Sequence, residues 1–102
     1  MNIALFKIWL IKNGTSKKIA TDNISRIKRI DNELIASINS SIDKEYTKDK
    51  CDELIKCFSN YGQNTFMKNY NLKNLPIGKA QIHCYKLSLV KYLSFKKDYP
   101  FG

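Results

Sequence analysis

The sequence predicts an all-α fold, a four- to five-helix orthogonal bundle, and three observations support it. Apolar residues recur at three- and four-residue steps over long stretches, as one buried face of a helix requires. Only four glycines and two prolines occur in 102 residues, so helix breakers are scarce. The chain is 43% apolar and 12% aromatic, enough for a core without metal or disulfide staples. We therefore expect a single domain over residues 1–102.

The first third of the chain is expected to form two helices. The first runs from Ile3 to Asn13, and Gly14 ends it as a left-handed cap residue. Thr15 or Ser16 caps the start of the second, an amphipathic helix of about five turns. Its apolar face is built from Ile19, Asn23, Ile24, Ile27, Ile30, Asp31, Leu34 and Ile38.

The remaining chain is expected to hold two more helices and an ordered connection. Residues 39–41 interrupt the second helix and cap a short helical turn, Ile42 to Tyr46, before Asp49 begins a third helix. Residues 60–78 are expected to form an ordered connection that can include one helical turn. A final helix of some 18 residues is expected to begin near Lys79 and to end at Tyr99 and Pro100. The aromatic core is expected to be Phe6, Trp9, Phe58, Tyr85 and Tyr92.

The net charge of +9 matters less than its distribution along the chain. Lys, Ile and Asn make up 39 of 102 residues, a bias typical of an AT-rich genome that raises the lysine count whatever the function. Residues 1–30 hold seven basic and one acidic residue, residues 31–54 three and seven, and residues 55–102 eight and one. This segregation predicts a basic face that attracts a polyanion. A solvated surface that keeps the protein soluble is the alternative.

Both arginines of the chain lie on the outer face of the second helix, at Arg26 and Arg29, one turn apart. Their planar guanidinium groups recognise phosphate and guanine edges in ways that lysine cannot. Two exposed arginines on a solvated face are the alternative. Aromatic residues near Lys68 could also stack on bases, although aromatics at helical spacing are more often core. These candidates are Tyr61, Phe66 and Tyr70.

Catalytic and metal sites are not expected, and neither is a cofactor. Cys51 and Cys57 are six residues apart and adjacent His83 and Cys84 diverge, so zinc-ligand spacing is absent. A nuclease would need converging carboxylates, but Asp43 and Glu45 are two apart on a helix and do not share a face. There is no nucleophile motif and no glycine-rich phosphate loop. The chain is therefore expected not to be an enzyme.

The expected compartment is the cytoplasm. Three cysteines, an odd number, argue against a disulfide framework and fit a reducing environment. The longest apolar stretch, Ile3 to Ile11, is interrupted by Lys7 and is shorter than the roughly 20 residues of a membrane span. No membrane partner and no signal peptide are expected.

Several residues together resemble a known family. The start of the chain resembles the start of the SAM-like helical core-binding domain of tyrosine recombinases and phage integrases, which is their N-terminal DNA-binding domain. The residues that carry the resemblance are Phe6, Trp9 and Leu10, then Asn13, Gly14 and Ser16, then the run 23–30. The closing run 85–95 is similar to that domain's last helix. Similar modules occur in restriction-system proteins. Recombinases follow this module with a catalytic domain bearing Arg, His and Tyr, so strand exchange is not implied for these 102 residues.

The resemblance implies a module that grips double-stranded DNA, in recombination or restriction–modification, with basic helix faces. The implied DNA-binding residues are Ser16, Lys17, Lys18, Arg26, Lys28, Arg29, Lys79 and Lys86. We expect phosphate neutralisation, with Arg26 and Arg29 reaching the groove. A protein-interaction module, in a homo-oligomer or a larger parent protein, is the main alternative. A small nuclease using Asp43 or Glu45, RNA binding and membrane binding are weaker alternatives.

Overall fold

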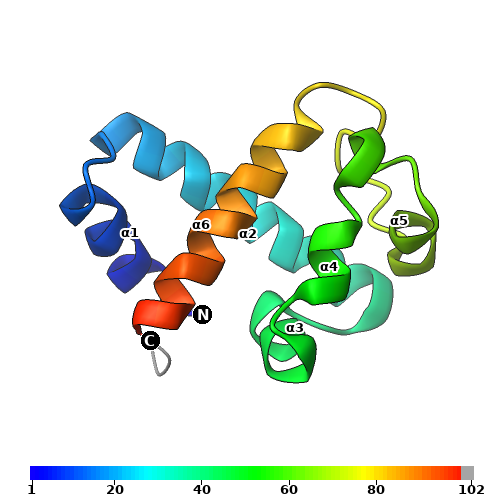
Figure 1. Cartoon of the computed structure of the whole chain (residues 1–102), viewed down its shortest axis with the longest axis horizontal. Coiled ribbons are helices and arrows are strands. Elements are labelled where there is room, and N and C mark those ends of the chain that lie inside the picture. The colour runs from blue at the N-terminus through cyan, green and yellow to red at the C-terminus, as the bar shows by residue number, and fades with distance from the viewer. Residues whose placement is uncertain (100–102) are drawn as a thin grey trace.

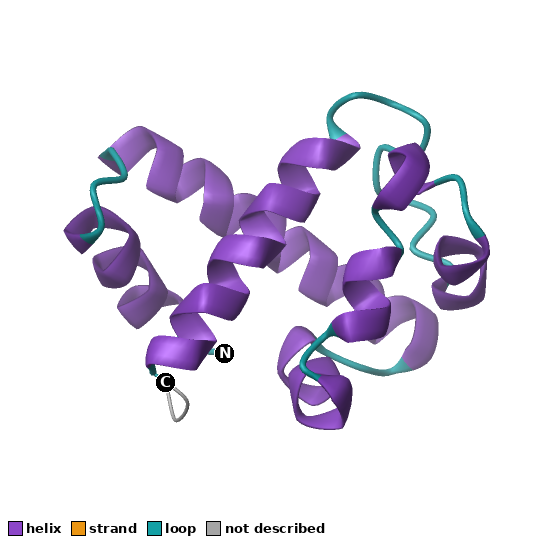
Figure 2. Ribbon diagram, viewed as in Figure 1, coloured by secondary structure: helices purple, strands orange, loops and turns teal. Residues whose placement is uncertain are grey.

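The computed structural model describes residues 1–99. Within them the chain folds into α-helices joined by turns and loops, with no β-strand (Figure 2). The elements are α1 (Ile3–Lys12), α2 (Lys17–Ile38), α3 (Ile42–Asp49), α4 (Asp52–Lys56), the turn η1 (Ser59–Gly62), α5 (Thr65–Tyr70) and α6 (Ile82–Asp98). The all-α prediction is confirmed, although the number of helices exceeds the four to five expected because short ones occupy the middle of the chain.

The two longest helices, α2 and α6, cross at the centre of the molecule (Figure 1). The helix α1 packs beside both of them on one side. The short helices α3, α4 and α5 gather around the other end of α2 (Figure 1). Basic segments from the two ends of the sequence are thereby brought into contact across α2 and α6.

The first two helices begin and end where their sequence signals predict. Gly14 follows α1 with φ +93°, a conformation that glycine adopts without steric cost. The side chain of Ser16 accepts a hydrogen bond of 3.3 Å from the Ile19 N–H and so caps α2. At the other end of α2, Asn39 is left-handed with φ +51°. Sequence capping rules therefore fix both boundaries of α2.

The middle of the chain differs from the prediction. Asp49 ends α3 instead of beginning a helix, because Lys50 and Cys51 follow it in left-handed conformation, with φ +55° and +63°. These residues return their N–H groups to Tyr46 and Glu45 carbonyls at 2.8 and 3.2 Å, an arrangement that closes a helix C-terminus. The break between the two expected segments therefore lies three residues later than predicted: the first continues past Tyr46 to Asp49, and the second begins at Asp52 as the short α4.

The connection between α4 and α6 is ordered, as expected, and contains η1 and α5. Asn64 caps α5 by accepting a hydrogen bond of 2.9 Å from the Met67 N–H. The last helix begins at Ile82 rather than near Lys79, since the preceding residues form a turn in which the Ile82 N–H bonds to the Lys79 carbonyl at 3.1 Å. Pro100, expected to help stop this helix, lies outside the described residues.

The core lies between α2, α6 and the helices that flank them. Phe6, Tyr92 and Phe95 form its aromatic centre, with Phe6 ring centroids 5.2 and 5.3 Å from the other two. Of the other aromatic residues expected in the core, Phe58 and Tyr85 are buried and Trp9 is half-buried. Ile19 and Ile38 of α2 are 51% and 42% exposed. Their prediction as core was wrong because both lie near the ends of α2, away from its crossing with α6.

Candidate nucleic-acid interface

A hollow of about 500 Å³ lies where the middle of α2 meets the start of α6 and the loop before it. Three of the predicted DNA-binding residues line it together: Arg26 and Arg29 from α2, and Lys79 from the loop. We call this the arginine hollow. Its other lining residues are Asn74, Leu75, Pro76, Gln81, Cys84 and Tyr85, so its lining holds no carboxylate.

Both guanidinium groups of the arginine hollow are held by neutral partners. Arg29 donates from Nη1 to the Tyr85 hydroxyl at 3.4 Å and from Nη2 to the Asn74 carbonyl at 3.3 Å. Arg26 donates from Nη1 to Ser88 Oγ at 3.4 Å. Since each guanidinium carries five N–H donors, most of them stay available to a ligand. The partners orient the two cations without cancelling their charge.

Arg26 rests on a buried polar chain at the crossing of α2 and α6. Ser88 is fully buried and donates from Oγ to Asn23 Oδ1 at 2.8 Å. Asn23, 3% exposed, donates in turn from Nδ2 to the Ile19 carbonyl at 2.9 Å. The sequence predicted Asn23 on the apolar face of the second helix, and Ser88 was not among the predicted functional residues. The sequence feature that could have indicated this contact is a polar residue at an apolar position of each of the two helices, Asn23 and Ser88.

The loop that carries Lys79 is tied to α2 as well. Glu33 is 9% exposed, and its carboxylate accepts hydrogen bonds from the Asn74 backbone N–H at 3.0 Å and from Asn74 Nδ2 at 3.2 Å. The carbonyl of Asn74 is the acceptor for Arg29. One loop residue therefore fixes both the loop and an arginine of the hollow.

The other residues predicted on α2 lie outside the arginine hollow. Lys17, Lys18 and Lys28 are exposed, and Ser16 uses its hydroxyl as the α2 cap. Lys18 and Arg29 are eleven residues apart, about three turns, so they lie on one side of α2. Lys17 and Lys28 have the same spacing and lie on a neighbouring side. Arg29 therefore shares a side of α2 with Lys18, whereas Arg26 lies nearly opposite Lys17 and Lys28 around the helix.

Lys86 lines a second hollow, of about 520 Å³, on the other flank of the start of α6. We call this the tyrosine hollow because Tyr61, 57% exposed, forms part of its wall. Its other lining residues are Phe58, Ser59, Asn60, Ala80, Ile82 and His83. His83 and Cys84 therefore line different hollows, as expected for neighbours on a helix.

Ion pairs within residues 1–99 involve none of the eight predicted DNA-binding residues. The cations that are paired are the Met1 amino group, Lys48, Lys56 and Lys96. The acidic segment 31–54 supplies all of their partners. The ion-paired carboxylates of this segment therefore contact cations outside α2 and the start of α6.

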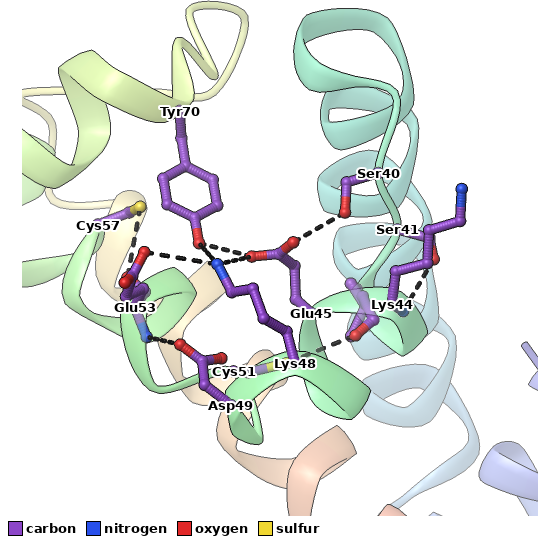
Figure 3. Close-up of polar contacts among 11 residues, drawn as sticks. Ser40, Ser41, Lys44, Glu45, Lys48, Asp49, Cys51, Glu53, Cys57 and Tyr70 are labelled. Carbon is purple, nitrogen blue, oxygen red and sulfur yellow. Dashed lines mark hydrogen bonds and ion pairs between the residues drawn. The ribbon is translucent and has the colours of Figure 1, made fainter.

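Besides Glu33, two more carboxylates of the acidic segment make buried or half-buried contacts that support the fold. Glu45 is 5% exposed and accepts hydrogen bonds from Tyr70 at 2.5 Å and from Ser40 at 2.8 Å, with Lys48 Nζ 3.3 Å away (Figure 3). Asp43 faces the opposite way and accepts a hydrogen bond of 2.7 Å from Tyr92 of α6. The expectation that these carboxylates do not share a face is confirmed. No cluster of three or more metal-ligating side chains occurs in the described part of the chain.

The three cysteines occupy two kinds of environment. Cys51 and Cys57 are fully buried, and burial raises the pKa of each thiol to about 12. Cys84 is half-buried in the wall of the arginine hollow. The Cys84 thiol therefore lies beside the two arginines, so its rate of chemical modification can show whether a ligand occupies the arginine hollow.

Comparisons with known proteins add no family or function. No protein-family model, curated protein or solved structure matches this chain. Among the described helices, none has the length and apolar character needed to cross a membrane. The similarity to the recombinase core-binding domain stays a prediction from the sequence, and the functional interpretation rests on the two hollows.

Proposed function

We propose that this chain binds double-stranded DNA through a positive surface formed by α2 and the start of α6, and has no catalytic activity of its own. One observation carries the proposal: Arg26, Arg29 and Lys79, from segments about fifty residues apart, line one hollow that holds no carboxylate. Like charges repel one another, so a fold that holds several cations around one hollow is typical of a site that binds an anion.

The ligand that suits the arginine hollow is a phosphate group of the DNA backbone. Guanidinium forks match the geometry of phosphate oxygens and form strong charge-assisted hydrogen bonds with them. Arg26 is half-buried and directed towards Ser88 on α6, so it is better placed for a phosphate in the hollow than for a base edge deep in a groove. We therefore propose that binding depends on the backbone and only weakly on base sequence.

Further cations extend the contact along the duplex. Lys17 and Lys18 lie in the first turn of α2, which holds no acidic residue, so the positive end of the helix dipole adds to their charge. Lys28 and Lys86 are further candidates for phosphate contacts. In this proposal the chain is the DNA-binding module of a recombinase- or restriction-type protein, acts in the cytoplasm and needs no cofactor.

A salt titration of binding to a fluorescently labelled duplex tests the proposal. If about five phosphates are contacted, the logarithm of the affinity should fall with the logarithm of salt concentration at a slope near −4 to −5. Replacing both Arg26 and Arg29 by Ala should weaken binding at least tenfold and make the slope shallower by about 2, since two phosphate contacts are removed.

A matched control separates the hollow from total charge. Lys44 and Lys68 are exposed, lie on α3 and α5, and form no ion pair within the described chain. Their double replacement by Ala removes the same charge and should leave affinity nearly unchanged. A wild-type slope near zero would overturn the proposal, and so would a control that loses as much affinity as the arginine variant.

A protein-interaction role is the second candidate, favoured by the outer face of α1. Ala4, Ile8 and Ile11 are exposed at helical spacing, with Ile8 61% and Ile11 42% accessible. Apart from Lys7, this outer face is apolar, and an exposed apolar helix face is typical of a surface that a partner covers. This candidate predicts association that grows with concentration in sedimentation experiments, is lost in Ile8→Ser, and occurs without duplex affinity at physiological salt.

A further inference from the structure

We propose that Tyr61 stacks on an unpaired nucleobase in the tyrosine hollow, while Lys86 binds the phosphate next to that base. This inference rests in part on the proposed function, because it adds a contact for single-stranded nucleic acid at the edge of the duplex. Its observations are independent of the arginine hollow. They are the backbone conformation of Tyr61, its exposure, and the presence of Lys86 in the lining of the same hollow.

The backbone at Tyr61 is strained. Asn60, Tyr61 and Gly62 have consecutive positive φ values of +51°, +57° and +80°. A left-handed turn of this kind is unfavourable for residues with a Cβ, and Tyr61 has neither the freedom of glycine nor the locally bonding side chain of asparagine. Strain that persists in a fold clusters at functional sites.

Burial of the ring does not account for this strain, because the Tyr61 side chain is 57% exposed. The turn is instead fixed by its own backbone and by the loop before α6. The Gly78 N–H bonds to the Tyr61 carbonyl at 2.6 Å, and the Gln63 N–H bonds to the Asn60 carbonyl at 2.9 Å. Asn60 Nδ2 donates to the Gln63 carbonyl at 3.2 Å. These bonds hold the Tyr61 backbone in place and so present the ring in the hollow.

The chemistry of the tyrosine hollow suits a nucleotide. Tyr61 offers an aromatic face, Lys86 and His83 come from α6, and Ser59 and Asn60 add hydrogen-bonding groups. The lining contains no carboxylate that would repel a phosphate. An aromatic platform beside a cation is the combination with which proteins bind single-stranded nucleic acid, because every base has a π face.

The other aromatic candidates for stacking are less suited. The ring of Phe66 lies 5.5 Å from Lys56 Nζ, which already covers it as a cation–π partner. Tyr70 is buried and donates to Glu45. Of the three aromatic residues that the sequence suggested for stacking, Tyr61 is the one with both a free face and an adjacent hollow.

The two hollows flank the same turn of the chain. Lys79 and Gln81 line the arginine hollow, and Ala80 between them lines the tyrosine hollow. A duplex whose backbone lies in the first hollow would bring its end, or a base displaced from it, towards the second. The ligand we infer is therefore duplex DNA that carries an unpaired base at its edge.

The test compares a blunt hairpin duplex, the same hairpin with a short single-stranded overhang, and the overhang strand alone. The overhang contains aminopurine, a fluorescent adenine analogue whose emission falls when it stacks on an aromatic ring. Wild-type protein should bind the overhang duplex about tenfold more tightly than the blunt one, the contribution expected of one stacked base. Aminopurine emission should fall on binding.

Two variants assign the effect to the ring. Tyr61→Ala should lose both the tenfold preference and the quenching but keep its affinity for the blunt hairpin, whereas Tyr61→Phe should keep all three. Far-ultraviolet circular dichroism checks that both variants fold. Equal wild-type affinity for blunt and overhang duplexes would overturn the inference, as would a preference that survives in Tyr61→Ala or disappears in Tyr61→Phe.

The three ligands distinguish failure of this inference from failure of the proposed function. If the blunt hairpin binds with the expected salt slope but the overhang adds nothing, duplex binding stands and stacking is wrong. If the blunt hairpin does not bind but the single strand does, with quenching that depends on Tyr61, stacking stands and duplex binding is wrong. If none of the three ligands binds, both are wrong.

Discussion

Tyr70 of α5 donates a hydrogen bond of 2.5 Å to the buried carboxylate of Glu45 on α3. Burial raises the pKa of Glu45, but hydrogen bonds from Tyr70, Ser40 and Lys48 outweigh it, so the pKa lies below the ordinary value of 4.5. Desolvation lowers the pKa of Lys48, but its hydrogen bonds to Tyr70 and Glu45 and the charge of Glu45 raise it above the ordinary value. The fold therefore stabilises the charged forms of both Glu45 and Lys48.

The first prediction concerns acid stability. Because the pKa of Glu45 is lower in the folded chain than in the unfolded one, its contribution to stability is complete above about pH 4.5 and is lost as pH falls through the folded pKa. The free energy of unfolding, measured by urea titration, should therefore decrease between pH 4.5 and lower values.

Glu45→Gln tests which residue causes this loss. The variant should be less stable by about 1–3 kcal/mol at neutral pH, because charged hydrogen bonds are replaced by weaker ones. It should also lose less stability in acid than the wild type. An unchanged acid dependence in Glu45→Gln would show that other carboxylates control it.

The second prediction concerns Ser88 as a positioning residue for Arg26. Ser88→Ala leaves the buried Asn23 Oδ1 without its donor, which should cost about 1–3 kcal/mol of stability in urea unfolding. It also frees Arg26 from its partner on α6, so duplex affinity should fall severalfold at low salt.

A double-mutant cycle separates positioning from a general loss of structure. In the background of Arg26→Ala, the further change Ser88→Ala should not weaken duplex binding again, because the residue that it positions is gone. Additive losses of affinity in the cycle would contradict the positioning role.

The third prediction concerns the cysteines. A thiol reagent near neutral pH should modify Cys84 in the folded protein and reach Cys51 and Cys57 only after unfolding, since those thiols are buried and hold a pKa of about 12. Duplex DNA should slow the modification of Cys84, because it occupies the hollow that Cys84 lines. Mass spectrometry of timed samples measures both effects, and labelling of Cys84 at equal rates with and without duplex would argue against a ligand in the arginine hollow.

The fourth prediction concerns the strain at Tyr61. Glycine adopts positive φ without the steric cost of a Cβ, so Tyr61→Gly should stabilise the fold by up to about 1 kcal/mol after its greater flexibility in the unfolded chain is taken into account. The urea midpoint should rise. A clear fall in that midpoint would show that packing of the ring outweighs the backbone strain.

Local signals accounted for much of the fold. Gly14 and Ser16 mark the boundary between α1 and α2 because their backbone conformation and capping chemistry are set by neighbours in sequence. The break between α3 and α4 was predicted three residues too early because Lys50 and Cys51 are not residue types that favour left-handed backbone. Their N–H groups close the C-terminus of α3 by bonding to the Tyr46 and Glu45 carbonyls, a role more often filled by glycine or asparagine.

The candidate site was only partly predictable. The sequence suggested Arg26 and Arg29 as an arginine pair on the second helix and Lys79 through the family resemblance, but their meeting in one hollow depends on how α2 crosses α6. The neutral partners of the arginines, Tyr85 and Ser88, come from residues more than fifty positions away. The tyrosine hollow likewise forms between η1 and α6, which are distant in sequence. Sequence spacing therefore could not predict that Lys86 lines a different hollow from Arg26, Arg29 and Lys79.

The arginine hollow also bears on heat resistance. Three like charges around one concave surface push α2 and the start of α6 apart unless an anion lies between them. A bound multivalent anion would relieve this repulsion and so stabilise the packing of the two longest helices. The melting temperature should therefore be higher in sulfate than in chloride by more than the general salting-out effect of sulfate. This additional rise in melting temperature should vanish in the Arg26→Ala, Arg29→Ala variant. The surface proposed to bind DNA would thus also affect how tightly α2 and the start of α6 pack together.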